Sequence, residues 1–199
     1  SALGTAAGTG IPLAEGMVSY LDDIDQVQVY NGSIWTAAGR IVQVIQTVKT
    51  DTFSSTSTSF TDVTGLTVTI TPATTSSRIL LLGDVMIGGL DGNNYYQARL
   101  AGGNAGDYVG DAASNRTRAL LNIRASFAVT AASGEQVVGR WPFMYVDSPA
   151  TTSATTYSVQ VRRDAITAGT VYVNRQGADV DASYVVRGAS SLIAVEVAA

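Results

Sequence analysis

The stretch Leu66-Thr67-Val68-Thr69-Ile70-Thr71 decides the fold class, because its apolar and threonine side chains alternate strictly. Successive side chains of a strand point to opposite faces of its sheet, so this pattern predicts a half-buried strand. The same period of two recurs along the chain, whereas no long window sustains helical spacing. The recurrences are Ile123, Ala125, Phe127 and Val129; Tyr157, Val159 and Val161; and Ile193, Val195 and Val197.

Turn-forming clusters separate these runs at the spacing expected of an all-β sandwich, for example at Thr64-Gly65, Ser133-Gly134 and Arg187-Gly188. Parallel strands would need helices between them, and the sequence offers neither the room nor the pattern, so the sheets should be antiparallel. We therefore expect an all-β fold, an antiparallel two-sheet sandwich of jelly-roll type with about ten strands.

A boundary is expected near 36–40, which divides the chain into an N-terminal segment, 1–40, and a sandwich domain, 41–199. The segment should form a short hairpin with an acidic turn at Asp22, Asp23 and Asp25, followed by a tight Asn31-Gly32 turn. So few residues cannot hold a core of their own, so the segment should attach or oligomerise the protein. Its candidate attachment residues are Met17, Tyr20, Val27, Val29, Tyr30 and Trp35.

The chain contains no cysteine and no histidine. Disulfides, thiolate metal sites and histidine-assisted nucleophiles are thereby excluded. Asp84 is the one acid inside a strongly apolar strand, where it can be an acid catalyst, the partner of an arginine in the core or a group facing a sister subunit. Asp91, Asp107 and Asp111 with Asn93 are better explained as turn residues than as a calcium site. We expect no enzymatic activity, no cofactor and no metal.

The net charge of −4, with Lys49 as the only lysine, argues against a nucleic-acid partner. The longest wholly aliphatic run, Ile79–Leu82, is far shorter than the roughly 20 residues that span a bilayer, so no membrane insertion is expected. The first sixteen residues lack the basic start and apolar centre of a signal peptide.

Two stretches, Ile79–Ile87 and Trp141–Val146, are apolar on both faces. Each can be a central strand under a loop, or a strand whose outer face is buried by a symmetry mate in a homo-oligomer. Pro142 has no amide hydrogen, which favours an edge or interface position. The candidate interface residues are Trp141, Phe143 and Tyr145.

A run of tyrosine and asparagine forms the most promising contact surface, because these side chains suit hydrogen bonding and stacking against sugars. The alternative is that Tyr95 or Tyr96 fills the core, as strand alternation would demand. The candidate receptor-contact residues are Asn93, Asn94, Tyr95, Tyr96 and Tyr108.

Two segments match known sequence motifs. The first, Glu15–Asp25 followed by Val27–Trp35, has the form of a short motif that ends in VYNGSxW, and in this it resembles tail and minor structural proteins of tailed bacteriophages. Ile41–Pro72 is similar to the start of a phage fibre-type β-domain, and Gly188–Val197 to its last strand. The resemblance carries over no catalytic residue.

The resemblance implies a structural component of the virion exterior, foremost a homotrimeric fibre or tail-tip protein that contacts a host surface glycan or protein. One alternative is a capsid decoration or head-fibre protein held to the head by its N-terminal segment. A further alternative is a secreted C1q-like adhesin. A depolymerase would bring a longer repetitive β-helix and a pair of acids, and the sequence shows neither.

Overall fold

The computed structural model describes residues 13–23, 26–39, 41–90, 94–124, 136–166 and 168–198. The chain divides into two compact units, Ser1–Val42 and Gln43–Ala199. In the described ranges, no helix is both long enough and apolar enough to cross a membrane.

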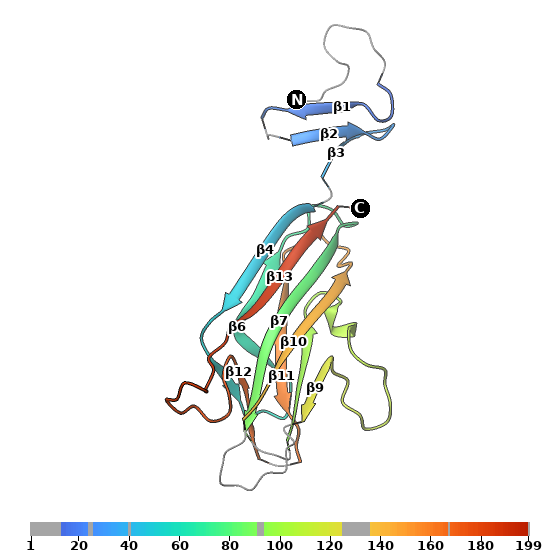
Figure 1. The fold of residues 1–199 in the computed structure, drawn as a ribbon. Coiled ribbons are helices and arrows are strands. Elements are labelled where there is room, and N and C mark those ends of the chain that lie inside the picture. Colours follow the sequence, from blue (N-terminus) through green and yellow to red (C-terminus); the bar gives the residue numbers. More distant parts are fainter. Residues whose placement is uncertain are drawn as a thin grey trace. The chain divides into compact units, whose positions relative to one another are not determined.

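The smaller unit is a three-stranded antiparallel sheet of β1 (Val18–Leu21), β2 (Gln26–Tyr30) and β3 (Trp35–Ala37), in that order (Figure 1). The pairing of β1 with β2 confirms the expected hairpin. Strand β3, which pairs with β2, was not predicted from the sequence. The tight turn is also confirmed: the Asn31 Oδ1 accepts hydrogen bonds from the backbone nitrogens of Ser33 at 3.0 Å and Ile34 at 2.9 Å. Gly32 takes a φ of +92° there, which glycine adopts without strain.

The larger unit is the predicted antiparallel sandwich (Figure 1). One sheet contains β4, β13, β7 and β10, and the other has the order β6-β11-β8-β9. These two sets of four strands are connected as in a jelly roll, which confirms the expected fold class. Its strands are β4 (Ile41–Lys49), β5 (Phe53–Ser55), β6 (Thr61–Ile70), β7 (Arg78–Leu90), β8 (Tyr95–Ala101), β9 (Leu121–Arg124), β10 (Gln136–Asp147), β11 (Thr155–Arg163), β12 (Thr170–Val173) and β13 (Ser190–Val197), with one short 3-10 helix, η1 (Ala105–Asp107).

The long strand β7 organises the first sheet. Strand β10 pairs with it along its whole length, from Asp147 opposite Ile79 to Gln136 opposite Leu90. On the other edge of β7, β13 pairs with the first half and β12 with the last four residues, and β5 continues the sheet beyond β12. Among the described strands, β10 pairs with β7 alone, so Pro142 lies on an edge strand as its missing amide hydrogen predicted.

The core lies between the two sheets. On β6 the apolar members of the opening stretch, Leu66, Val68 and Ile70, are buried as the alternation predicts. On β11, Tyr157, Val159 and Val161 are likewise fully buried. Burial of one such side chain is worth about 1.5–3 kcal/mol. Of the run predicted from Ile123 to Val129, β9 contains Ile123, and 125–129 lie outside the described residues.

Strand β13 alternates, but the apolar run Ile193, Val195 and Val197 is not the face turned to the core. Leu192, Ala194 and Glu196 are the fully buried residues. The Glu196 carboxylate accepts hydrogen bonds from the Ala73 backbone nitrogen at 2.7 Å and from the Gln43 Nε2 at 2.5 Å. Burial raises the pKa of Glu196, but the hydrogen bonds from Gln43, Ser77 and Ala73 outweigh it and hold that pKa below its ordinary value.

Candidate functional site

Strand β10 turns one row of side chains to the core and one row away from it. Trp141 and Phe143 are buried, whereas Met144 is 63% exposed and Val146 is 50% exposed. The prediction that Trp141, Phe143 and Tyr145 form an oligomer interface is therefore corrected: these side chains pack in or against this chain's own core. The strand was identified rightly and its outward face wrongly, because both faces are apolar and alternation cannot tell them apart.

The outward row of β10 continues across neighbouring strands. In register, Met144 stands opposite Leu82 and Val146 opposite Leu80 on β7, and Leu82 stands opposite Ile193 on β13. Strand β4 turns Gln43 toward the buried Glu196, so its alternate residues face outward, and Val44 is 60% exposed. We call the resulting surface the outer face; it comprises Val44, Val48, Leu80, Leu82, Pro142, Met144, Val146 and Ile193.

An ion pair borders the outer face. The Asp84 Oδ2 accepts hydrogen bonds from the Arg140 Nε at 2.9 Å and Nη2 at 2.6 Å. Asp84 thus pairs with an arginine, but the pair lies on the outward side of β7 and not in the core, where one of the expected alternatives put it. Its Oδ1 is buried and has no hydrogen-bond partner among the described residues. Protein–protein interfaces usually have a polar rim beside an apolar centre, and this ion pair supplies polar groups at one end of the outer face.

The candidate attachment residues lie on both faces of the small N-terminal sheet. In the β1–β2 register, Tyr20 stands opposite Val27 and Val18 opposite Val29, so these four share one face. Val18, Tyr20 and Val27 are exposed. Tyr30 and Trp35 stand opposite each other on the other face, with ring centroids 5.5 Å apart. Met17 lies just before β1, where its carbonyl oxygen accepts from the Tyr30 backbone nitrogen at 2.8 Å.

The predicted receptor-contact residues do not form one exposed surface. Asn94 and Tyr96 are buried, and the Asn94 Nδ2 donates to the Ala168 carbonyl oxygen at 3.1 Å. Tyr96 therefore follows the alternative prediction and fills the core, while Tyr95 is half-buried on the opposite side of β8. Tyr108 stacks on Tyr145 with ring centroids 4.7 Å apart. Asn93 lies outside the described residues.

The glycine-rich loop after β8 is a structural element. Gly102 and Gly103 both have positive φ, and a β-carbon on Gly103 would lie 2.2 Å from the Asp147 Oδ2. That buried oxygen accepts hydrogen bonds from the Tyr157 hydroxyl at 2.6 Å and from the Asn104 backbone nitrogen at 3.2 Å. Burial, followed by the bond to Asp147, raises the pKa of Tyr157, so its hydroxyl stays protonated. The glycines let the loop approach β11 and Asp147 closely, and their role needs no phosphate.

No cluster of metal-binding acids exists among the described residues. Of the acids considered for calcium, Asp111 lies exposed in the connection between β8 and β9. Asp91 and the side chain of Asp107 lie outside what the structure describes.

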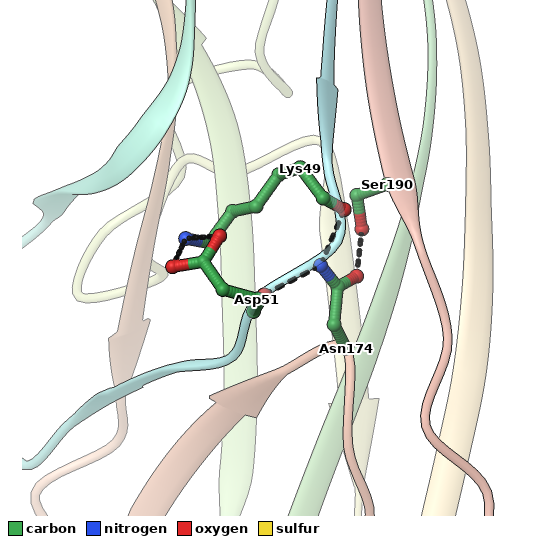
Figure 2. Close-up of polar contacts among 4 residues, drawn as sticks. All are labelled: Lys49, Asp51, Asn174 and Ser190. Carbon is green, nitrogen blue, oxygen red and sulfur yellow. Dashed lines mark hydrogen bonds and ion pairs between the residues drawn. The ribbon is translucent and has the colours of Figure 1, made fainter.

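A buried polar cluster joins four segments of the larger unit (Figure 2). The Asn174 Nδ2 donates to the carbonyl oxygens of Lys49 at 2.8 Å and Asp51 at 2.9 Å, and its Oδ1 accepts from the Ser190 hydroxyl at 2.5 Å. Ser190 in turn accepts from the Met86 backbone nitrogen at 3.0 Å. The cluster ties the β4–β5 connection, the residue after β12 and the start of β13 to β7, and its closed hydrogen bonding marks it as structural.

Lys49 completes this cluster as a buried cation with an exposed partner. Its side chain is 3% exposed, and its Nζ lies 2.9 Å from the Asp51 Oδ1, whose side chain is 78% exposed. The hydrogen bond from Lys49 holds the pKa of Asp51 below its ordinary value. The amine of the chain's only lysine is thus buried in an ion pair, and we assign it no reactive role.

No family model matches the sequence, and no curated protein matches it. Among solved structures, the chain is similar to a structure of the infectious bursal disease virus Gt strain, with 13% sequence identity and a TM-score of 0.37 over 87% of this chain and 44% of that chain. It is also similar to the VP2 subviral particle of that virus, with 13% identity and a TM-score of 0.35 over 85% of this chain and 40% of the other. It is similar as well to a structure of the Gx strain, with 14% identity and a TM-score of 0.35 over 85% of this chain and 41% of the other. The chain spans less than half the length of these matched chains, and likeness of this degree carries no argument about what it does.

Proposed function

We propose that this chain is a structural protein of the exterior of a bacteriophage particle, a homotrimeric fibre or tail-tip component that contacts the host surface and catalyses no reaction. The outer face carries this proposal. The kind of particle is inferred from the phage-like segments, which are Glu15–Trp35, Ile41–Pro72 and Gly188–Val197. The outer face is the surface through which we expect the copies to assemble.

The outer face supplies part of an assembly surface. Its residues lie within 44–48, 80–82 and 142–146 and at Ile193. With strands about 4.8 Å apart and about 3.3 Å per residue, they cover a projected area of about 220 Å². A standard interface takes about 800 Å² from each partner. The apolar centre therefore supplies about a quarter of one such interface, and the Asp84–Arg140 ion pair extends it.

The other two copies of the trimer are the proposed occupants, with the outer faces of all three copies packed around a common axis. Side-by-side pairing at the β10 edge is unfavourable, because Pro142 interrupts the row of amide donors midway along the strand. Packing through the outer faces needs no amide donors and buries Met144 and Val146. Burial of either side chain is worth about 1.5–3 kcal/mol, which favours association through the face over association through the edge.

The N-terminal sheet favours a second candidate, a capsid decoration or head-fibre protein. Its face of Val18, Tyr20, Val27 and Val29 presents apolar side chains from a unit too small to build a core. Such a face suits docking onto another virion protein. In this alternative the sandwich projects from the head and the N-terminal unit grips the capsid.

Labelling on intact particles tests the proposal and separates its two forms. An antibody against the sandwich domain, imaged on negatively stained virions, should mark the tail fibres or tail tip. Label over the head surface would replace the fibre proposal with the decoration alternative. If the antibody labels no virion and the protein is found instead in the culture medium as a free product, the virion proposal is wrong.

A further inference from the structure

The face of the second sheet that points away from the core holds two arginines on one aromatic ring. The Arg99 Cζ lies 4.2 Å from the centroid of the Phe60 ring, and the Arg162 Cζ lies 5.7 Å from the same centroid. Gln160 stands opposite Arg99 and Gln97 opposite Arg162 in the β8–β11 register, so the two arginines are diagonal neighbours, about 7–8 Å apart at their α-carbons.

Polar neighbours orient this pair without neutralising it. The Arg99 Nε donates to the Gln160 Oε1 at 2.8 Å, and the Gln160 Nε2 donates to the Asp62 Oδ1 at 3.0 Å. The Ser158 hydroxyl donates to that same oxygen at 2.7 Å. Asp62 therefore accepts from neutral groups, and no ion pair joins Arg99 or Arg162 to an acid in the part of the chain that the structure describes.

Other arginines of the protein show the contrast. Arg140 pairs with Asp84, and Arg175 and Arg187 both pair with Asp179. Two guanidinium groups on one ring repel each other, and an anion between them would remove that repulsion. The terminal nitrogens of Arg99 and Arg162 form no hydrogen bond to the described residues. The planar fork of N–H groups on each guanidinium can therefore bind a carboxylate or sulfate.

Beside Arg162, a buried side chain adds further unused hydrogen-bonding capacity. Gln97 is 7% exposed, and its Oε1 has no hydrogen-bond partner among the described residues. Native proteins rarely leave a buried acceptor unpaired. That oxygen is inaccessible from the surface, so a ligand hydroxyl reaches it only if the Gln97 side chain moves, and the site proposed below does not depend on it.

We propose that Arg99, Arg162 and Phe60 form a binding site for the carboxylate or sulfate group of an acidic saccharide. Phe60 and Gln160 hold the two guanidinium groups in place, and the ligand anion bridges them. This site lies on the sheet opposite the outer face, and its existence does not depend on the proposed assembly.

Titration of the full chain with sodium glucuronate, sodium sulfate, sodium phosphate and glucose, followed by calorimetry or by amide chemical shifts at low ionic strength, tests the site. Glucuronate, sulfate or both should bind with millimolar affinity, and glucose should not. Arg99→Gln and Arg162→Gln should each weaken binding at least about fivefold, and Asp62→Asn should strengthen it. Phe60→Leu should also weaken it, because it removes the platform and leaves the charge unchanged.

Arg78→Gln is the matched control, since it removes the same charge from the start of β7 in the other sheet and should leave the affinity unchanged. Circular dichroism and the melting temperature establish that each variant is folded. The proposal is overturned if neither glucuronate nor sulfate binds, if only inorganic phosphate does, or if Arg78→Gln weakens binding as much as Arg99→Gln.

Discussion

Phe143 lies directly against Gly83 across the β10–β7 pair: a β-carbon on Gly83 would lie 2.0 Å from the Phe143 Cζ. This contact fixes the inward direction of Phe143, and the pleat of the strand then turns Met144 outward. The location of the outer face thus follows from one close approach between a glycine and an aromatic ring.

Gly83→Ala should destabilise the protein by about 1–3 kcal/mol, because the added methyl group must displace the Phe143 ring in a packed core. Gly106→Ala is the matched control, since a β-carbon there meets nothing within 4 Å. Urea denaturation of both variants measures the effect. Equal stability of the two would show that Phe143 is not held against Gly83.

Phe143→Ala and Met144→Ala should separate the two faces of β10. The first empties a core position and should cost about 3–5 kcal/mol, whereas the second trims an exposed side chain and should change the monomer's stability by no more than about 0.5 kcal/mol. Chemical denaturation at a concentration low enough to exclude association gives both values. A larger loss for Met144→Ala would mean that the faces are exchanged.

Asn174→Ala should cost about 2–4 kcal/mol, because it leaves the Lys49 and Asp51 carbonyl oxygens and the Ser190 hydroxyl without their buried partner. Asn174 also has a φ of +63°, which asparagine tolerates better than alanine. Asn174→Gly relieves the backbone and loses the same hydrogen bonds, so it should recover only part of the stability. Thermal melts of the variants measure these losses. Asn115→Ala, in an exposed turn, is the control and should leave the melting temperature unchanged.

Glu196 should make stability depend on pH. Its pKa is lowered in the folded protein, so its contribution is present above the unfolded pKa of about 4.3 and is lost as the pH falls through the folded value. Glu196→Gln should therefore be less stable than the wild type at pH 7, and the difference should shrink at pH 3. A difference that stays constant over this range would contradict the assigned hydrogen bonding.

The sequence was sufficient for the fold class but not for the direction of every strand. Leu66, Val68 and Ile70 alternate with threonine, so polarity identifies their inward face. Polarity misidentifies the inward face of strand β13, because that face includes Glu196. The Glu196 carboxylate accepts hydrogen bonds from Gln43 and Ala73, which lie far away in the sequence. Polarity cannot identify the inward face of strand β10, because neither face is polar between Trp141 and Val146.

The two proposed surfaces also depend on strand register, which composition does not contain. Phe60, Arg99 and Arg162 belong to separate segments, and only the pairing of β11 with β6 and β8 brings them together. Asn94 and Tyr96 were chosen for their chemistry, and burial removed them from the surface. A residue's type suggests what it can bind, but its register decides whether it is available.

The central claim is that the outer face holds copies of this chain together, and sedimentation velocity of the wild type and of Met144→Asp over a range of concentrations tests it most directly. The account predicts a wild-type species with three times the mass of one chain, and a Met144→Asp variant that sediments as a monomer with the wild-type circular dichroism spectrum. A wild type that remains monomeric at every concentration, or a Met144→Asp variant that assembles as the wild type does, would contradict it.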